Sequence, residues 1–202
     1  MAETLHAGRQ QPRSLSIPEG HTLILDAVSR RQMNQLHIRE GLVRVAYSSC
    51  SVEAAQRLPI TIGFLQGGDQ VPLEMLHHSC LHLEAIQRTS LSEALQPDPV
   101  SEAITLADWT ASLLVIQHLA DSETRLRALL RLLVTRLGQR RGPWYFLPMR
   151  LKHECLAELV NHSRVTVSRH MSRWRQQGWI EPGVGGAAQL LIAPALIEEL
   201  AD

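Results

Sequence analysis

The feature that most constrains the fold of this 202-residue chain is the pattern of apolar residues between positions 151 and 177. They recur at helical spacing in two short groups: Leu156, Leu159 and Val160, then Val167, Met171 and Trp174. Asn161, between the groups, tolerates the left-handed backbone that a sharp turn requires, and Ser163 is a suitable N-cap for the second group. The window therefore predicts two short helices that cross at a turn, with Ala157 allowing their close approach.

The second of these helices carries a polar and basic row outside its buried stripe. In a helix-turn-helix, this helix enters the major groove of DNA. We expect Arg164 and Arg169 to read base edges, because bidentate contact from Arg to guanine is the commonest specific contact. Val165 suits the methyl group of thymine. The other polar residues are expected to touch phosphates and fix the register: Ser163, Thr166, Ser168, Arg173 and Arg175.

The net charge of zero hides an uneven distribution. Residues 121–180 hold 12 basic and 4 acidic residues, whereas the rest of the chain holds 8 basic and 16 acidic residues. Of the 20 basic residues only Lys152 is not Arg. A high Arg count alone is equally consistent with genomic base content, but one basic segment in a neutral chain is typical of a nucleic-acid-binding domain.

Residues 16–95 have a different pattern. Short apolar runs such as Thr22–Leu25, Gly41–Ala46 and Leu58–Phe64 alternate with turn signals such as Gly67–Asp69. This alternation predicts an antiparallel sandwich or roll. Near the other end of the chain, Gly178–Ile180, a group of glycines and Gln189–Ile192 predict a strand, a tight turn and a second strand, which form a wing after the helices.

A long helical segment is expected over residues 101–138. One seam has spacings of 4, 3 and 4 and consists of Trp109, Leu113, Ile116 and Ala120. Such a seam favours packing lengthwise against a partner helix, and an ordinary amphipathic helix lying on its own β domain fits equally well. Asp121 favours an N-cap, so we place a hinge there and a second helix after it. Its predicted inner residues are Leu126, Leu129, Leu130, Leu133 and Leu137.

The order of these elements resembles the CRP/FNR family of bacterial transcription regulators. Residues 156–169 follow the helix-turn-helix of that family without a gap, with Asn161 in place of the usual turn glycine. The core Arg164–Arg169 is similar to the cyanobacterial nitrogen-control branch, which reads GTA and TAC half-sites. The resemblance implies an α+β fold: an effector-type, cyclic-nucleotide-binding-like β roll over residues 1–100, a dimerisation helix and hinge over 101–121, and a winged helix-turn-helix over 122–202.

By the same resemblance, the chain is expected to act as a homodimer on a palindromic DNA site, with RNA polymerase as a further partner. It also departs from the family. Val71–Glu74 replaces the phosphate-binding turn, and Ser79–Cys80 stands where Arg-Ser would fall, so we expect no response to cAMP. Ala120 replaces a basic residue near the hinge, which argues against 2-oxoglutarate. The effector is left open, and no cofactor is expected.

Two other functions are kept as alternatives. A metal-dependent enzyme of the cupin type would use the cluster His77, His78, Cys80 and His82, although an incidental group of surface histidines is the simpler interpretation. A protein-interaction module would use the β roll to bind a partner protein. We expect no catalytic residues and no metal ligands.

The sequence also suggests where the protein works. The first 30 residues contain no apolar segment of the signal-peptide kind, and no stretch approaches the length of a membrane-spanning helix. Its three cysteines, Cys50, Cys80 and Cys155, are an odd number at wide spacing, which favours reduced thiols. We therefore expect a cytoplasmic protein without membrane partners.

Overall fold

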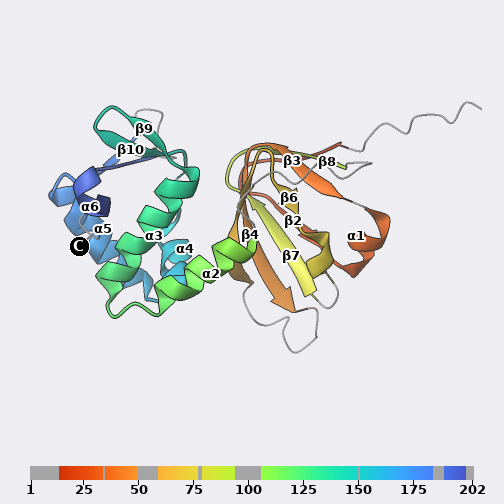
Figure 1. Ribbon diagram of the computed structural model, residues 1–202, viewed down its shortest axis with the longest axis horizontal. Coiled ribbons are helices and arrows are strands. Elements are labelled where there is room, and N and C mark those ends of the chain that lie inside the picture. The colour runs from red at the N-terminus through yellow and green to blue at the C-terminus, as the bar shows by residue number, and fades with distance from the viewer. Residues whose placement is uncertain are drawn as a thin grey trace, which may run out of the picture. The chain divides into compact units, whose positions relative to one another are not determined.

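The computed structural model describes residues 14–33, 35–49, 59–76, 79–93, 106–149, 151–183 and 189–198. The chain divides into two compact units (Figure 1). The first comprises residues 1–59 and 64–103, and the second comprises residues 60–63 and 104–202. No helix among the described residues is long and apolar enough to cross a membrane.

The first unit contains two four-stranded sheets. One has the order β1 (Ser14–Ile17), β8 (Thr89–Glu93), β3 (Leu36–Glu40) and β6 (Gln70–Val71). The other has the order β2 (Thr22–Leu25), β7 (Ser79–Ala85), β4 (Leu42–Ser49) and β5 (Ile60–Gln66), of which residues 60–63 are grouped with the second unit. A short helix, α1 (Ala27–Gln32), and a 3₁₀ turn, η2 (Leu73–Met75), also belong to it.

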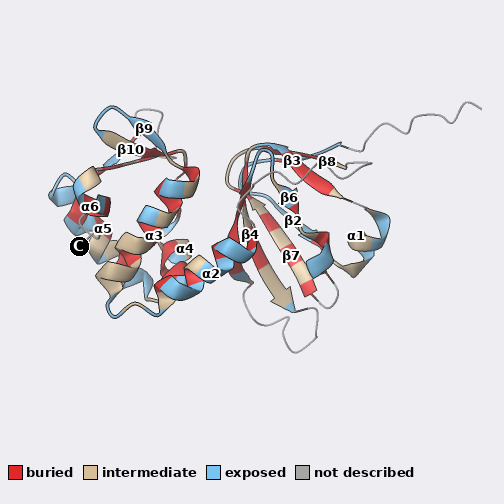
Figure 2. Cartoon of the chain, in the orientation of Figure 1, coloured by how far each residue is buried: buried red, intermediate tan, exposed pale blue. Residues whose placement is uncertain are grey.

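Alternation of side chains along the strands builds the core of this unit. On β4, Val43 and Val45 lie opposite Ala85 and Leu83 of β7, and all four side chains are fully buried. In Figure 2, buried and intermediate bands alternate along strands such as β7. Because successive side chains of a strand point to opposite faces, this alternation leaves one face apolar and the other polar. The predicted antiparallel β roll is confirmed.

The second unit is mostly helical. It contains α2 (Leu106–Gln117), α3 (Ser122–Leu137), α4 (His153–Leu159), α5 (Arg164–Gln176) and α6 (Pro194–Glu198). Its four strands form an antiparallel sheet in the order β11 (Ile180–Pro182), β12 (Leu190–Ile192), β10 (Trp144–Leu147) and β9 (Gln139–Arg141). The α+β fold is therefore as expected.

The helical segment breaks where the N-cap signal predicts. The carboxylate of Asp121 accepts hydrogen bonds from the backbone N–H groups of Glu123 and Thr124, at 3.0 and 2.9 Å. All five predicted inner leucines of α3 are buried. One detail differs from the expectation: α2 ends at Gln117 rather than at Ala120. Residues 139–147 form the hairpin of β9 and β10 within the wing sheet.

Candidate nucleic-acid interface

The turn between α4 and α5 has the backbone that the sequence predicts. Asn161 has a φ of 51°, and it is the one non-glycine residue with a positive φ in the described part of the chain. The backbone N–H of His162 donates to the carbonyl of Ala157 at 2.9 Å, which closes the end of α4. Ser163 then caps α5, because its hydroxyl accepts the backbone N–H of Thr166 at 3.1 Å.

The inner face of α5 is anchored in the core of the second unit. Val167, Met171 and Trp174 are at most 2% exposed. Leu156, Ala157 and Leu159 of α4 are buried as well. Burying such a stripe fixes the rotation of α5 about its own axis, so it determines which residues face outward.

The outer face of α5 presents the residues expected to read bases. The side chain of Arg164 is 68% exposed, Val165 is 66% exposed, and Arg169 is also exposed. The guanidinium of Arg164 lies 2.8 Å from the carboxylate of Glu154 on α4. An exposed ion pair of this kind contributes only about 0.2–1 kcal/mol, so Arg164 can leave it for a stronger partner.

Three of the hydroxyls expected to touch phosphates have partners inside the motif. Ser168 lies within hydrogen-bond distance of the ring of His153, with Oγ 2.7 Å from Nδ1. The hydroxyls of Ser163 and Thr166 are 2.9 Å apart. Ser168 and Thr166 are also half-buried, whereas Ser163 is exposed. These hydroxyls therefore help to hold the two helices and the cap in place.

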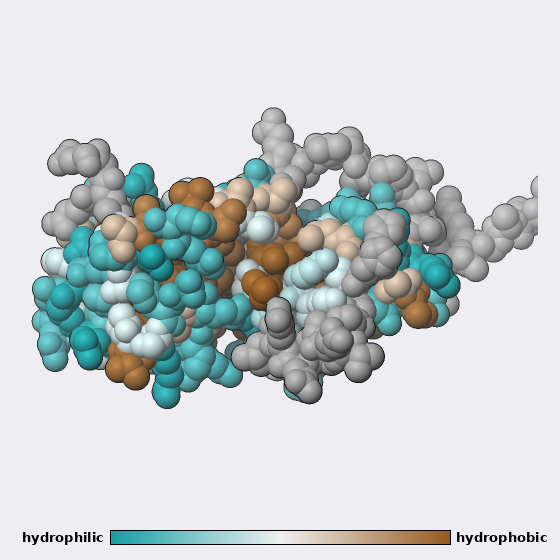
Figure 3. Space-filling model, turned by 90° about the horizontal axis from the view of Figure 1, so that it is seen from below, coloured by the Kyte–Doolittle hydropathy of each residue, from teal (hydrophilic) through white to brown (hydrophobic). Residues whose placement is uncertain are grey.

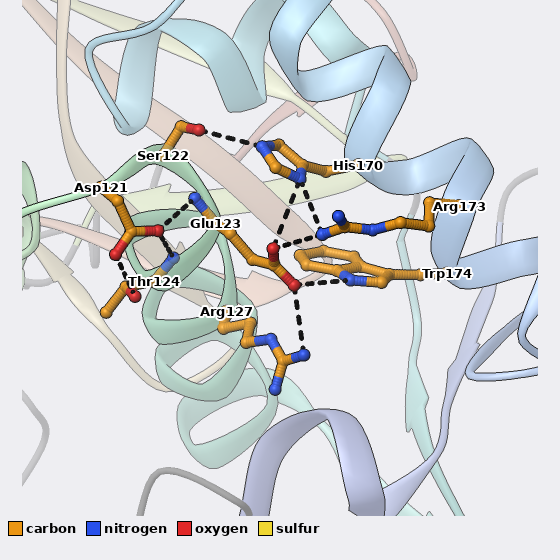
Figure 4. Close-up of polar contacts among 8 residues, drawn as sticks. All are labelled: Asp121, Ser122, Glu123, Thr124, Arg127, His170, Arg173 and Trp174. Atoms are coloured by element: carbon orange, nitrogen blue, oxygen red, sulfur yellow. Dashed lines mark hydrogen bonds and ion pairs between the residues drawn. The ribbon is translucent and has the colours of Figure 1, made fainter.

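The side chain of Arg173 is partly exposed, and its guanidinium also contacts other side chains of the protein. Its guanidinium forms an ion pair with Glu123, in the first turn of α3, and lies 3.2 Å from Nδ1 of His170 (Figure 4). Glu123 also accepts hydrogen bonds from Arg127 and from the indole of Trp174. We refer to Glu123, Arg127, His170, Arg173 and Trp174 as the Glu123 cluster. Nothing in the sequence pattern singled it out, because its members come from two helices whose sequence positions are about fifty residues apart.

Electrostatics within the cluster keep the carboxylate ionised. Burial alone would raise the pKa of Glu123, but the hydrogen bonds and charge of Arg173 outweigh burial and hold the pKa below its usual value. Burial lowers the pKa of His170, and Arg173 and Arg169 add to this effect against the opposing charges of Glu123 and Asp121.

Three of the four residues predicted for a dimer interface are buried within the single chain. Trp109, Leu113 and Ile116 are at most 6% exposed within the single chain, so they have little surface left for a second copy. Ala120 is exposed but follows the end of α2. The exposed apolar residues of α2 are instead Leu114 and Val115, at 57% and 64%.

Beside Val115, an open groove of about 690 Å³ runs between α2 and α3. Its apolar lining includes Ile116, Leu119, Ala128 and Leu132, and Arg131 and Arg136 add charge. In the view from below, apolar patches interrupt an otherwise hydrophilic surface (Figure 3). Contiguous apolar surface rimmed by polar groups is typical of an interaction site.

The segment that stands in place of a phosphate-binding turn in the roll buries most of its apolar side chains. Val71, Leu73 and Leu76 are at most 5% exposed, and the carboxylate of Asp69 accepts the backbone N–H of Gln66 at 2.7 Å. His77 and His78 lie outside the described residues. Nε2 of His82 is 2.8 Å from the hydroxyl of Ser48, and no group of three or more His, Cys, Asp or Glu side chains that could hold a metal occurs in the described ranges.

Models of known protein families match residues in both units. A model of the Crp-like helix-turn-helix domain matches residues 125–198. A model of the cyanobacterial CRP family N-terminal domain matches residues 15–103. A search of curated protein sequences found no significant match.

Solved structures with the same fold include a CRP/FNR-family transcriptional regulator from Thermus thermophilus, with 19% identity, a TM-score of 0.63, and coverage of 94% of this chain and 98% of that one. A second CRP-family regulator from the same organism has 20% identity and a TM-score of 0.61, covering 93% and 97%. FixK2 from Bradyrhizobium japonicum has 15% identity and a TM-score of 0.61, covering 91% and 93%. At these identities, the likeness shows a shared fold.

Proposed function

The chain belongs to the CRP/FNR family of DNA-binding transcription regulators, and from this premise we propose that it acts as a homodimer on a palindromic DNA site. The matching families and the similar structures are regulators, so the enzyme alternative is set aside. The observation that carries the proposal is the outward row of α5. Arg164, Val165 and Arg169 project from a helix whose opposite face is anchored by the buried Trp174.

The proposed roles on α5 follow from exposure and partners. Arg164 and Arg169 read guanine edges, and Val165 contacts a thymine methyl. Ser163 is exposed beside the N-terminus of the helix, where backbone N–H groups favour a phosphate. Thr166 and Ser168 support the motif first, since their hydroxyls already have partners within it.

A second copy of this chain is the proposed occupant of the exposed apolar face of α2. Leu114 and Val115 would face the other copy, with the groove between α2 and α3 beside them. A two-fold axis presents two recognition helices to half-sites about 34 Å apart, one turn of DNA. Asp121 then separates the dimerisation helix from the DNA-binding domain, and we propose it as the hinge.

We also place the protein in the cytoplasm, because its proposed target is chromosomal DNA. RNA polymerase is its proposed partner at promoters. The segment Val71–Glu74 buries Val71 and Leu73 and contains no Arg to pair with a cyclic phosphate, which supports a regulator that does not respond to cAMP.

The test is selection of random duplex DNA by the purified full-length protein at fixed physiological salt, followed by sequencing. We expect a palindrome with half-sites near GTA and TAC. Only diffuse binding that weakens with salt would contradict specific recognition, because such binding reflects phosphate contacts alone. In that case, the roll as a protein-interaction module becomes the leading alternative, and capture of a stable partner by the full-length protein would support it.

A further inference from the structure

One carboxylate in the second unit serves several partners on two helices. Oε1 of Glu123 accepts hydrogen bonds from Nη2 of Arg127 at 3.2 Å and from Nε1 of Trp174 at 3.4 Å. Oε2 pairs with Arg173 and lies 4.0 Å from Nδ1 of His170. Figure 4 shows these side chains converging on the carboxylate from α3 and α5. The Glu123 side chain is 30% exposed, so it is partly shielded from water.

These contacts join the beginning of α3 to the end of α5. Arg173 and Trp174 lie in the last turn of α5, and Glu123 lies in the first turn of α3, two residues after the N-cap Asp121. Trp174 is completely buried, and the guanidinium of Arg127 stacks over its ring at 5.9 Å and over the ring of Trp179 at 5.3 Å. Charge-assisted hydrogen bonds in such a setting are stronger and more directional than neutral ones.

Arg173 is thereby committed to the protein. Its Nη2 contacts both Glu123 and His170, so moving the whole guanidinium to a DNA phosphate would leave a partly buried carboxylate without this cation. Arg164 on the same helix differs, because its carboxylate partner Glu154 is 61% exposed. Arg164 and Arg173 thus have different surroundings, which suggests different roles.

We propose that Glu123 is a positioning residue for DNA recognition, which sets the orientation of α5 through Arg173 and Trp174, and that Arg173 supports DNA binding through this pair rather than by contact with a phosphate. The inference rests on the proposed function of α5 as the recognition helix. It reassigns Arg173 from the group of phosphate contacts to the support of the helix.

The test compares wild type, Glu123→Gln, Arg173→Gln and the double variant, all as full-length protein. Affinity is measured for the duplex selected by the wild type and for a scrambled duplex, over a range of salt concentrations. Positioning predicts that each single variant binds the selected duplex about tenfold more weakly, and that the double variant is no worse than either single one. Binding to the scrambled duplex and the salt slope stay at the wild-type values.

The opposite assignment gives the opposite sign. If Arg173 contacts a phosphate, Glu123→Gln releases it and tightens binding to both duplexes, and Arg173→Gln reduces the salt slope by about 0.9. Either result overturns the proposal. A loss of folded protein lowers binding to both duplexes by the same factor, so the ratio of the two affinities separates positioning from stability. Arg173→Gln alters a side chain that is 46% exposed, which provides a second variant should Glu123→Gln unfold.

A different result would show that the proposed DNA-binding function itself is wrong. A wild-type protein that prefers no duplex overturns the recognition role of α5 and the inference with it. A wild-type protein with a clear preference, which both Gln variants retain in full, overturns the inference alone.

Discussion

Arg164 and Arg169 are the residues that we propose to read the DNA sequence. Both are exposed on the outer face of α5, and the buried stripe beneath them keeps that face outward. Replacing either by Ala removes a bidentate donor to guanine. We expect a loss of about 1–3 kcal/mol of binding free energy on the cognate duplex and little change on a scrambled duplex.

Fluorescence anisotropy at fixed salt measures both affinities. Arg88→Ala is the matched control, because Arg88 is an exposed arginine of the first unit and its removal changes the net charge equally. Equal weakening on both duplexes would reveal phosphate contacts and contradict the base-reading role.

His170 makes the stability of the second unit depend on pH. Its pKa in the folded protein lies below the ordinary 6.5, chiefly because of burial, while Glu123 and Asp121 pull it upward and Arg173 and Arg169 push it down. Between the folded and unfolded pKa values, the unfolded chain binds the extra proton, so stability falls as pH drops below about 6.5.

His170→Gln removes that proton linkage. We therefore expect the free energy of unfolding of the wild type to fall, relative to the variant, between pH 7 and pH 5. Urea denaturation at a series of pH values measures this difference. A constant difference across the range would mean that folding does not perturb the histidine.

At the scale of elements, the N-cap of α3 is where the helical segment is divided. Asp121 accepts two backbone N–H groups and the hydroxyl of Thr124, and the bond from that hydroxyl is the main reason why its pKa lies below 3.8. Asp121→Ala should cost about 0.5–2 kcal/mol in unfolding free energy at pH 7. Because the folded pKa is depressed, the charge-dependent part of the stabilisation is present above pH 3.8 and is lost as pH falls through the folded pKa.

Asp121→Asn is the matched variant for this cap, since it keeps the acceptor and removes the charge. Chemical denaturation should show it near the wild type at pH 7 and without the acid-dependent loss. Equal destabilisation by Ala and Asn would assign the effect to the charge rather than to capping.

Elements were predictable from sequence where local chemistry decides them. The turn at Asn161, the caps at Ser163 and Asp121 and the leucines of α3 all follow from periodicity and capping rules. The helix α1 was missed, although Asp26 and Ser29 form a capping box at its start. It has only six residues and no buried face, so it carries no periodic signal.

Contacts between residues far apart in the sequence could not be predicted from periodicity and capping rules. The seam of Trp109, Leu113 and Ile116 marked a buried face correctly, but periodicity cannot say whether a face packs on its own chain or on a second copy. The hairpin of β9 and β10 joins the wing sheet through β12, about forty-five residues further along the chain. The Glu123 cluster escaped for the same reason, because a surface carboxylate and a distant Arg look ordinary in sequence.

At the scale of the whole molecule, the proposed function requires two copies of the chain on one DNA site. A homodimer presents two recognition helices. Once one helix has bound its half-site, binding of the second is effectively intramolecular. The exposed apolar residues of α2, Leu114 and Val115, are the proposed contact between copies. Val115→Glu puts a charge on this face, where a second copy would have to desolvate it.

Val115→Glu should therefore convert the dimer to a monomer in sedimentation velocity and weaken binding to the full palindrome by about 100-fold or more, toward the affinity for a half-site. Val28→Glu is the matched control, since Val28 is 57% exposed on α1 in the other unit and the substitution adds the same charge. Circular dichroism checks that both variants fold. A Val115→Glu protein that stays dimeric would exclude this face of α2, and a Val28→Glu protein that becomes monomeric would move the interface to the roll.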